Sequence, residues 1–378
     1  MTFFIREVAT LQARVIMLVD LDYFFAQCEE RRNPSLKDKP VVVCVYSGRS
    51  EDSGAVSTAN YIARKYGVTS GIPIFLAKKK LKKDAVFLPM DHEFYEEVSG
   101  KIMRILRSHA DFFEQVGIDE AYLDVSQKVK GSFEEAKELA QKIKEEVKAQ
   151  QKLTCSIGIG PNKLVAKIAA DIQKPDGLTI VKHEQVESFL SPLPVSCLIG
   201  VGRKTKKKMQ TLGIRTIGDL AKYDVQRLIE IFGKKLGTYF HNASIGEDYE
   251  LVRESGEVES ISRISTLKED TRDLKIILEK TKQLCDEVHA KLVQRELGFK
   301  SVGIVAVMTD MSVRSRSRTF ENPTNELEVL KKTVKELFEK FLNESELEAR
   351  RVGVKVSNFV KEQERQKQIT NFIGLAKN

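Results

Sequence analysis

The sequence has few of the features that anchor a chain in a membrane, a disulfide framework or a zinc site. No apolar run approaches the ~20 residues needed to span a bilayer, and Arg6 and Glu7 end the apolar N-terminal stretch too early for a signal peptide. The five cysteines are scattered and include no C-x-x-C pair, and the five histidines are equally dispersed. We therefore expect a protein of the reducing cytoplasm that has no disulfide framework, no zinc ribbon and no membrane partner.

Length and charge point to several domains and to a polyanionic partner. A chain of 378 residues that is 42% hydrophobic and 31% charged is too long for one ordinary core, so we expect roughly two to four domains. The net charge of +8 is only a weak indication of a polyanionic partner. Local clusters of positive charge indicate it more strongly. Five cations occur in the six residues from Arg203 to Lys208, and Arg314, Arg316 and Arg318 alternate with serine. Such clusters are typical of surfaces that bind phosphates.

Two adjacent acids, Asp119 and Glu120, lie between two apolar runs. Neighbouring side chains on a regular strand point to opposite faces, so a turn or bulge is needed to aim both at one divalent cation. The apolar run from residue 15 ends in Asp20 and Asp22 and offers a further acid. We expect Asp20 to meet Asp119 and Glu120 across a sheet. Whether Asp22 and Asp124 are structural or functional stays open.

The first half of the chain alternates strand-like and helix-like patterns. Apolar spacing predicts strands at 15–22, 41–45, 86–88, 112–116, 121–125 and 153–159, and helices at 23–32, 58–66, 74–82, 93–108, 133–150 and 162–172. Removing residues 24–90 as an insert leaves strand–helix–strand–strand–helix–strand, the order of a ferredoxin-like sheet. In that fold the first strand neighbours the central hairpin, so Asp20 can lie beside the acidic pair.

The second half contains a basic helical region and a second strand–helix pattern. Residues 182–247 are helical and basic, with a tight turn at 199–202, and residues 248–259 form a polar linker. Strands at 261–267, 302–308, 313–320 and 352–356 and helices at 274–295 and 326–342 then repeat the βαββαβ order without an acidic pair at the hairpin. Because alternate residues of a strand point to the same face, the three arginines share one face, and Val313 and the serines share the other. We therefore predict a binding module here.

Three motifs together resemble the Y-family DNA polymerases, in particular their archaeal DinB-like (DNA polymerase IV) group. They are residues 19–26 (VDLDYFFA), 60–64 (NYIAR) and 118–124 (IDEAYLD). Residues 156–163 and 174–177 extend the resemblance, and the domain order agrees to about residue 358. One departure is Gly117, where the family usually carries serine, and we expect only a local effect from it.

The resemblance implies an α+β multidomain fold. A ferredoxin-like palm (14–23 and 91–181) would carry a fingers insert (24–90), followed by a helical helix-hairpin-helix thumb (182–247), the linker (248–259), a second βαββαβ little-finger domain (260–358) and a tail (359–378). The implied reaction is template-directed addition of a deoxynucleotide to a primer 3′ end, with low fidelity, translesion synthesis and no proofreading exonuclease. Primer-template DNA and deoxynucleoside triphosphates would be the partners of a monomer.

The resemblance also assigns the metal and nucleotide contacts. Asp20, Asp119 and Glu120, with the Leu21 carbonyl, would hold two Mg²⁺ ions, which suits a reaction that needs positioning and charge neutralisation. Thr58, Tyr61 and Arg64 are spaced to share one helix face that suits a triphosphate. The remaining implied nucleotide contacts are Tyr23, Phe24, Phe25 and Lys174. The Phe25 ring would be a steric gate that leaves no room for a 2′-hydroxyl.

DNA and a sliding clamp are the implied macromolecular partners. Gly200 and Gly202 resemble a helix-hairpin-helix turn whose N–H groups approach a phosphate, with Lys204 adding charge. Arg314, Arg316 and Arg318 would lie along the DNA backbone, although arginines on an edge strand can also serve only to prevent aggregation. The tail residues Gln366, Ile369, Phe372 and Ile373 resemble a clamp-binding peptide.

Two other functions compete with a polymerase. A nucleotidyl cyclase uses similar acids on a similar sheet, but it has no use for a thumb, a DNA-tracking module or a clamp-binding tail. A catalytically dead DNA-binding scaffold would not need Asp20, Asp119 and Glu120 intact. The sequence therefore favours the polymerase.

Overall fold

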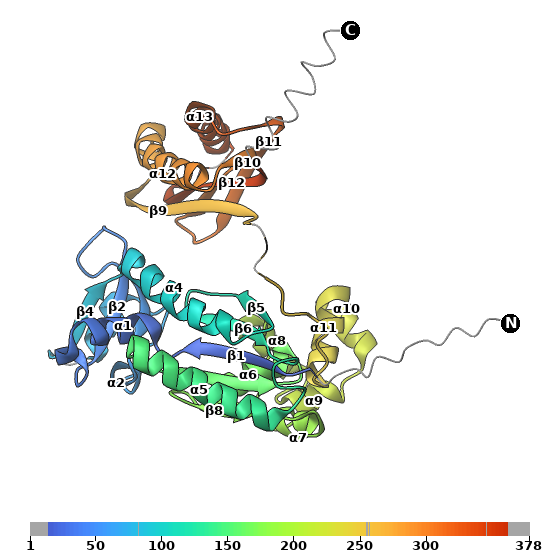
Figure 1. The fold of residues 1–378 in the computed structure, drawn as a ribbon. Coiled ribbons are helices and arrows are strands. Elements are labelled where there is room, and N and C mark those ends of the chain that lie inside the picture. Colours follow the sequence, from blue (N-terminus) through green and yellow to red (C-terminus); the bar gives the residue numbers. More distant parts are fainter. Residues whose placement is uncertain (1–13, 82, 255, 257, 345, 362–378) are drawn as a thin grey trace, which may run out of the picture. The chain divides into compact units, whose positions relative to one another are not determined.

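The computed structural model describes residues 14–81, 83–254, 256, 258–344 and 346–361. The chain divides into two compact units, coloured by sequence in Figure 1. The first runs to Cys44 and continues through Val56–Ser70 and Lys80–Gly256, whereas the second takes Val45–Ala55, Gly71–Lys79 and the chain from Glu257. All five cysteines are free thiols. Among the described residues, no helix combines the length and the apolar character needed to cross a membrane.

A five-stranded sheet, which we call the palm sheet, forms the centre of the first unit (Figure 1). Its strands, in the order β5-β6-β1-β7-β8, are β5 (Phe112–Gln115), β6 (Glu120–Asp124), β1 (Ile16–Leu21), β7 (Cys155–Gly160) and β8 (Leu178–Ile180). Neighbours are antiparallel except β7 and β8. The arrangement of the first four confirms the predicted ferredoxin-like sheet. Strand β8 was not predicted, because three residues are too short for a periodic signal.

The two faces of the palm sheet are covered by different helices. On β1, Met17 and Val19 belong to the main core with residues of α4 (His92–Ser108) and α5 (Phe133–Gln151). Ile16 and Leu18 pack instead against α6 (Lys163–Ile172). A Cβ at Gly158 of β7 would lie 2.1 Å from the Ala166 carbonyl oxygen, so glycine is what lets α6 approach the sheet so closely. Because strand residues alternate, Asp20 lies in phase with Ile16 and Leu18, on the α6 face.

The predicted fingers insert contains a second, smaller sheet with the order β3-β2-β4. Its elements are α1 (Phe24–Arg32), a 3₁₀ turn (Pro34–Leu36), β2 (Val41–Tyr46), β3 (Gly54–Ala59), α2 (Tyr61–Arg64), α3 (Ile74–Lys80) and β4 (Val86–Pro89). The predicted helix over 58–66 is wrong at its start, because Thr58 lies in β3. Helix α2 begins only at Tyr61, where the Asn60 side chain accepts a hydrogen bond from the Ala63 N–H (3.0 Å).

A helical region follows the palm, as predicted. Its elements are 3₁₀ turns at His183–Gln185 and Val195–Cys197 and the helices α7 (Val186–Leu190), α8 (Arg203–Thr211), α9 (Ile217–Ala221), α10 (Val225–Phe232) and α11 (Lys234–Ser244). The predicted linker begins packed on the palm. Val252 is buried with Ile16 and Leu18, and the Asp248 carboxylate accepts a hydrogen bond from the Leu164 N–H (3.0 Å).

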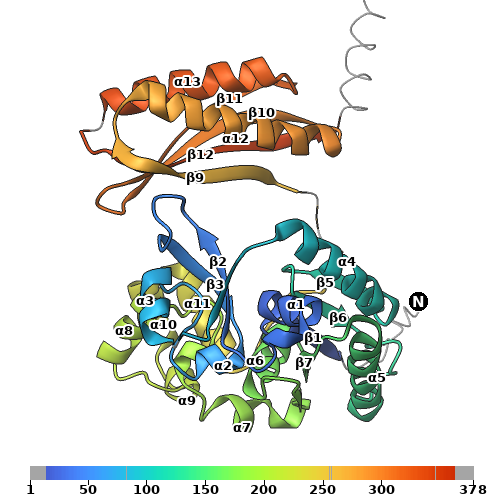
Figure 2. The ribbon, with the colours of Figure 1, turned by 90° about the vertical axis from the view of Figure 1, so that its left-hand side faces the viewer.

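The second unit contains a four-stranded antiparallel sheet, which we call the little-finger sheet. In the order β11-β10-β12-β9, its strands are β11 (Val313–Thr324), β10 (Leu297–Met308), β12 (Ala349–Lys361) and β9 (Ser260–Thr271). Figure 2 shows α12 (Leu274–Gln294) and α13 (Leu327–Asn343) on one face of it. The predicted βαββαβ order is confirmed. The two central strands, however, are the second and fourth of the unit, whereas in the palm sheet they are the first and third.

Candidate active site

The palm sheet brings the three predicted acids together at the end of β1. Asp20 lies directly opposite Glu120 in the β1–β6 register. The Leu21 N–H donates to the Asp119 carbonyl oxygen (2.8 Å), which ties the residue before β6 to the end of β1. The N–H groups of Val116 and Gly117 both donate to the Glu120 carbonyl oxygen (3.2 Å each), so the chain turns sharply before β6. The predicted meeting of Asp20 with the acidic pair is confirmed.

Two lysine ammonium groups lie among these carboxylates. Lys167 Nζ, from α6, is 2.5 Å from Glu120 Oε2 and 3.2 Å from Asp20 Oδ2. Lys174 Nζ is 2.7 Å from the same Asp20 oxygen. Burial alone would lower the pKa of each lysine, but the charge of Asp20 and the neighbouring acids raise it. Both ammonium groups therefore stay charged and offset part of the negative charge.

Lys167 is a site residue that the sequence analysis missed. It sits in the otherwise apolar run from Leu164 to Ala170, most of which is buried against the sheet. Two lysines one turn apart, Lys163 and Lys167, in a mostly apolar buried helix were the available signal, because a buried ammonium needs an anionic partner.

The electrostatics of Asp119 favour a cation at this position. Burial raises the pKa of Asp119, and the negative charges of Asp20 and Glu120 raise it further. Within the described ranges, no three carboxylate, imidazole or thiol side chains stand arranged as a metal-binding group. The donor set is nevertheless one that fits a hard divalent ion such as Mg²⁺, since it consists of carboxylate oxygens beside a backbone carbonyl.

Gly117 adjoins the same cluster. A Cβ at this position would lie 3.2 Å from both Asp119 Oδ1 and Glu120 Cγ. The departure from serine in the family pattern therefore leaves room beside two of the three acids, and the expectation of a purely local effect stays a prediction.

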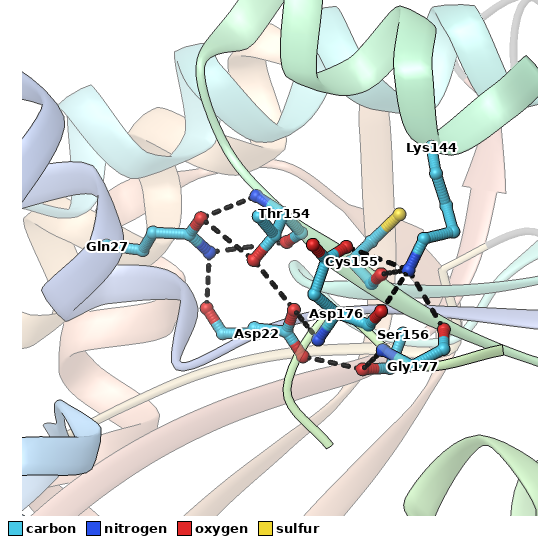
Figure 3. Close-up of polar contacts among 8 residues, drawn as sticks. All are labelled: Asp22, Gln27, Lys144, Thr154, Cys155, Ser156, Asp176 and Gly177. Carbon is cyan, nitrogen blue, oxygen red and sulfur yellow. Dashed lines mark hydrogen bonds and ion pairs between the residues drawn. The ribbon is translucent and has the colours of Figure 1, made fainter. Parts of the chain in front are cut away.

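Asp22 and Asp124 have hydrogen-bond partners outside the acid cluster. Asp22 is 1% exposed, and its carboxylate accepts hydrogen bonds from Thr154, Ser156 and the Asp176 N–H (Figure 3). Asp124 accepts hydrogen bonds from the N–H and hydroxyl of Ser126. Neither carboxylate is directed at the cluster around Asp20.

The aromatic residues after β1 have different surroundings. Phe24 is buried in the main core, whereas the half-buried ring of Phe25 stacks on Tyr95 with 4.7 Å between centroids. Tyr23 adopts φ +36°, an uncommon conformation for a residue with a large side chain. Its ring meets the edge of Tyr61 with 5.3 Å between centroids. The tyrosine pair thus joins the end of β1 to the start of α2.

The three residues predicted to share a helix face do not all lie on a helix. Thr58 belongs to β3, and only Tyr61 and Arg64 belong to α2. The Arg64 guanidinium lies 4.8 Å from the centre of the Tyr61 ring, and its Nε donates to the Ala59 carbonyl oxygen (2.8 Å). The helix-face argument for Thr58 is therefore wrong, although its place directly before Ala59 keeps it in the same segment.

The predicted thumb turn has the expected backbone form. Gly200 has φ +82°, and Gly202 is the N-cap of α8. Lys204 is exposed in the first turn of that helix. The start of α8 therefore presents N–H groups and positive charge to solvent.

The three little-finger arginines share a strand face, as predicted. Arg314, Arg316 and Arg318 pair across the sheet with the buried residues Ala306, Ile304 and Val302. They therefore lie on the face that bears α12 and α13. Arg316 is 2.7 Å from Glu344, and Arg318 is 2.5 Å from Glu336. The opposite face carries the exposed cations Arg351 and Lys355 on β12.

The clamp-like residues Gln366, Ile369, Phe372 and Ile373 lie outside the described residues.

Comparison with known proteins gives concordant matches along the chain. Residues 19–171 match the model of the impB/mucB/samB family, and residues 258–370 match that family's C-terminal domain. Residues 197–248 match a model described as the thumb domain of DNA polymerase-iota.

Similar whole proteins include a DNA polymerase IV of Nitrosopumilus maritimus, 49% identical over 96% of this chain and 100% of the relative. A DNA polymerase IV of Saccharolobus solfataricus is 42% identical over 92% of this chain and 97% of its own length. Among solved structures, a Y-family DNA polymerase chimera, Dbh-Dpo4(243-245)-Dbh, has a TM-score of 0.87 at 38% identity and covers 92% of this chain and 99% of its own. An insertion ternary complex of Dbh DNA polymerase has a TM-score of 0.66 at 37% identity, with the same coverage.

Proposed function

The chain belongs to the impB/mucB/samB family of Y-family DNA polymerases, and we propose that the acid cluster at the end of β1 is its nucleotidyl-transfer centre. The protein is a DNA-directed DNA polymerase of low fidelity that acts in translesion synthesis. Its substrates are primer-template DNA and deoxynucleoside triphosphates. Membership of this family excludes a nucleotidyl cyclase.

One observation carries the proposal: the β1–β6 register sets Asp20 opposite Glu120 and beside Asp119. Members of the family depend on a divalent metal, and we propose two Mg²⁺ ions held by Asp20, Asp119, Glu120 and the Leu21 carbonyl. Bound there, they would neutralise charge on the triphosphate and activate the primer 3′-hydroxyl. The ammonium groups of Lys167 and Lys174 adjoin the same carboxylates and add positive charge where phosphoryl oxygens would gather.

The proposed nucleotide contacts surround this centre. Tyr61 and Arg64 on α2 and Thr58 on β3 offer hydroxyl and guanidinium donors to a triphosphate, and Lys174 offers an ammonium. Tyr23 and Phe24 contribute through the backbone that follows β1, because the Phe24 ring is buried.

Phe25 is the proposed steric gate. Its ring is half-buried and is held by stacking on Tyr95, so it would not move aside for a 2′-hydroxyl. Replacement by alanine (Phe25→Ala) should raise ribonucleotide incorporation relative to deoxynucleotide incorporation by about one to two orders of magnitude. Single-nucleotide insertion kinetics with matched ribo- and deoxynucleotides measure this ratio. Unchanged sugar discrimination would remove Phe25 from the role.

The contacts with macromolecules are also proposals. Gly200, Gly202 and Lys204 would hold a phosphate at the start of α8, and Arg314, Arg316 and Arg318 would follow the DNA backbone. The tail segment containing Gln366, Ile369, Phe372 and Ile373 would bind a sliding clamp. A monomeric state and a cytoplasmic location stay predictions.

Primer extension with Mg²⁺ tests the proposed centre directly. Wild-type protein should extend primers on undamaged templates and past an abasic site, whereas the Asp119→Ala, Glu120→Ala double variant should not. Extension by the double variant would overturn the metal assignment. Absence of extension by the wild type, with DNA binding intact, would favour a catalytically dead scaffold.

A further inference from the structure

Asp22 is a buried carboxylate that the proposed chemistry does not use. It follows β1 directly and lies two residues from Asp20, yet it is 1% exposed. A carboxylate removed from water is stable only if hydrogen bonds replace its solvation. Its donors therefore indicate what it holds in place.

The donors come from β7, from Thr154 directly before it, and from the turn that follows α6. Asp22 Oδ1 accepts a hydrogen bond from the Ser156 hydroxyl (2.7 Å). Oδ2 accepts from the Thr154 hydroxyl (2.8 Å) and from the Asp176 N–H (2.9 Å). Ser156 Oγ in turn accepts from the Gly177 N–H (3.2 Å). Figure 3 shows Asp22 at the centre of these contacts.

Gln27 fixes the other side of Asp22. Its amide nitrogen donates to the Asp22 carbonyl oxygen (2.6 Å), and its amide oxygen accepts a hydrogen bond from the Thr154 N–H. The Asp22 N–H also donates to the Thr154 carbonyl oxygen (3.2 Å). The backbone of Asp22 is thus held at both ends, and its carboxylate is a fixed point for the turn.

Lys144 of α5 holds the same turn from a second side. Its Nζ lies 2.6 Å from the Asp176 carbonyl oxygen and 3.0 Å from those of Cys155 and Gly177. It also pairs with the Asp176 carboxylate (2.8 Å). The turn itself is tight, because a Cβ at Gly177 would lie 1.8 Å from the Gln173 carbonyl oxygen. Residues 174–177 are therefore anchored by one buried carboxylate and one partly buried ammonium group.

This anchored turn carries Lys174, whose ammonium reaches Asp20. We propose that Asp22 is a positioning residue that, with Lys144, holds the 174–177 turn so that the Lys174 ammonium is presented to the triphosphate of the incoming nucleotide. The inference rests on the proposed nucleotide contact of Lys174. The two carboxylates at the end of β1 would then have different roles. Asp20 belongs to the acid cluster, and Asp22 holds the turn.

The amide substitution Asp22→Asn separates this role from folding. The Ser156 and Thr154 hydroxyl groups can reorient to suit an amide, but the Asp176 N–H can only donate. Asparagine therefore keeps the packing and most hydrogen bonds and removes the charge that holds the turn. The substitution Lys144→Met weakens the same turn from α5 without touching β1. It serves as the second variant should Asp22→Asn fold poorly.

Steady-state kinetics with a double-mutant cycle tests the inference. Lys174→Ala should raise the KM for the deoxynucleotide about tenfold. Asp22→Asn and Lys144→Met should each raise it about fivefold with kcat within about twofold of the wild type. In the Lys174→Ala background neither should add a further effect. Equilibrium binding of a deoxynucleotide to enzyme on a dideoxy-terminated primer, with Ca²⁺ as the metal, should show the same coupling.

Two matched controls and three outcomes decide between the explanations. Asp124→Asn changes another palm-sheet carboxylate with hydroxyl and N–H donors, and Lys142→Met changes an exposed lysine on α5. Both should leave the KM unchanged. Multiplicative effects of Asp22→Asn and Lys174→Ala, or an unchanged KM in both Asp22→Asn and Lys144→Met, would overturn the inference. An unchanged KM in Lys174→Ala would overturn the proposed nucleotide contact itself.

Discussion

The palm sheet and the little-finger sheet contain the same succession of elements, yet only one can assemble an acid cluster. In the palm sheet the first and third strands, β1 and β6, are central neighbours, so the end of β1 meets the β5–β6 turn. In the little-finger sheet the corresponding strands, β9 and β11, lie at opposite edges. Residues at the end of β9 therefore never face the β10–β11 turn. The order of elements does not by itself decide which strand ends meet.

The acids in the two hairpins differ accordingly. Asp119, in the palm hairpin, has a raised pKa because it is buried beside Asp20 and Glu120. Asp310, in the little-finger hairpin, has a lowered pKa because the Ser312 N–H donates a hydrogen bond to its carboxylate (2.8 Å). An acid stabilised by its own turn does not need a cation. An acid repelled by neighbouring carboxylates gains more from a cation, so the contrast supports the palm hairpin as the proposed metal site.

The largest expected difference between the hairpins is in the rate of nucleotide addition. Asp20→Asn should lower kcat at least about a thousandfold, because several kcal/mol of charge stabilisation would be lost. Asp310→Asn, the same chemical change in the little-finger hairpin, should leave kcat within about twofold. Rapid-quench primer extension measures both. A comparable loss of kcat in the two variants would contradict the assignment of catalysis to the palm sheet and binding to the little-finger sheet.

The sequence was sufficient to predict the acid cluster. It was insufficient to predict which face of the little-finger sheet the helices cover. Asp20 and the acidic pair could be brought together because the ferredoxin-like arrangement, which the family resemblance also implied for the palm, sets the first strand beside the third. Strand β10 offers no such constraint, since the residues opposite Arg316 and its neighbours are apolar or small on both faces. Which face the helices cover is therefore set by packing between distant elements. Thr58 was assigned to the wrong element because helical spacing does not show where a helix begins. The Asn60 side chain caps α2, so this helix starts only after β3 has ended.

The second comparison concerns the two faces of the little-finger sheet and has a smaller expected effect. Replacing Arg316 and Arg318 by serine should weaken DNA binding roughly tenfold and lower the slope of log affinity against log salt by about two. Replacing their partners, Glu336 and Glu344, by glutamine should strengthen binding, because both guanidinium groups would be released. Fluorescence anisotropy over a salt series measures both quantities.

The helix-free face provides the matched test. Arg351→Ser with Lys355→Ser removes two exposed cations from the opposite face of the same sheet. If this pair weakens binding while the arginine and glutamate pairs change nothing, the DNA lies on the helix-free face and the arginines of β11 serve only their ion pairs.

The smallest expected effect is on stability, and its sign should reverse between the two hairpins. A carboxyl group with a raised pKa disfavours folding once it is ionised, so Asp119→Asn should raise the melting temperature in EDTA at pH 7 by about one or two degrees. A lowered pKa means that the ionised form favours folding above the ordinary aspartate range, so Asp310→Asn should lower the melting temperature at pH 7. The Asp119 difference should shrink as the pH falls toward the ordinary aspartate range, because its raised pKa lets the folded state protonate first. The Asp310 difference should be lost only below that range, as the pH falls through its lowered pKa. Adding Mg²⁺ should then stabilise the wild type more than Asp119→Asn, because a cation that binds only the folded state stabilises it more the tighter it binds. Calorimetry in EDTA measures both changes. If the two asparagine variants shifted the melting temperature in the same direction, the two hairpin acids would share one electrostatic environment, and the argument for a metal at the palm hairpin would fail.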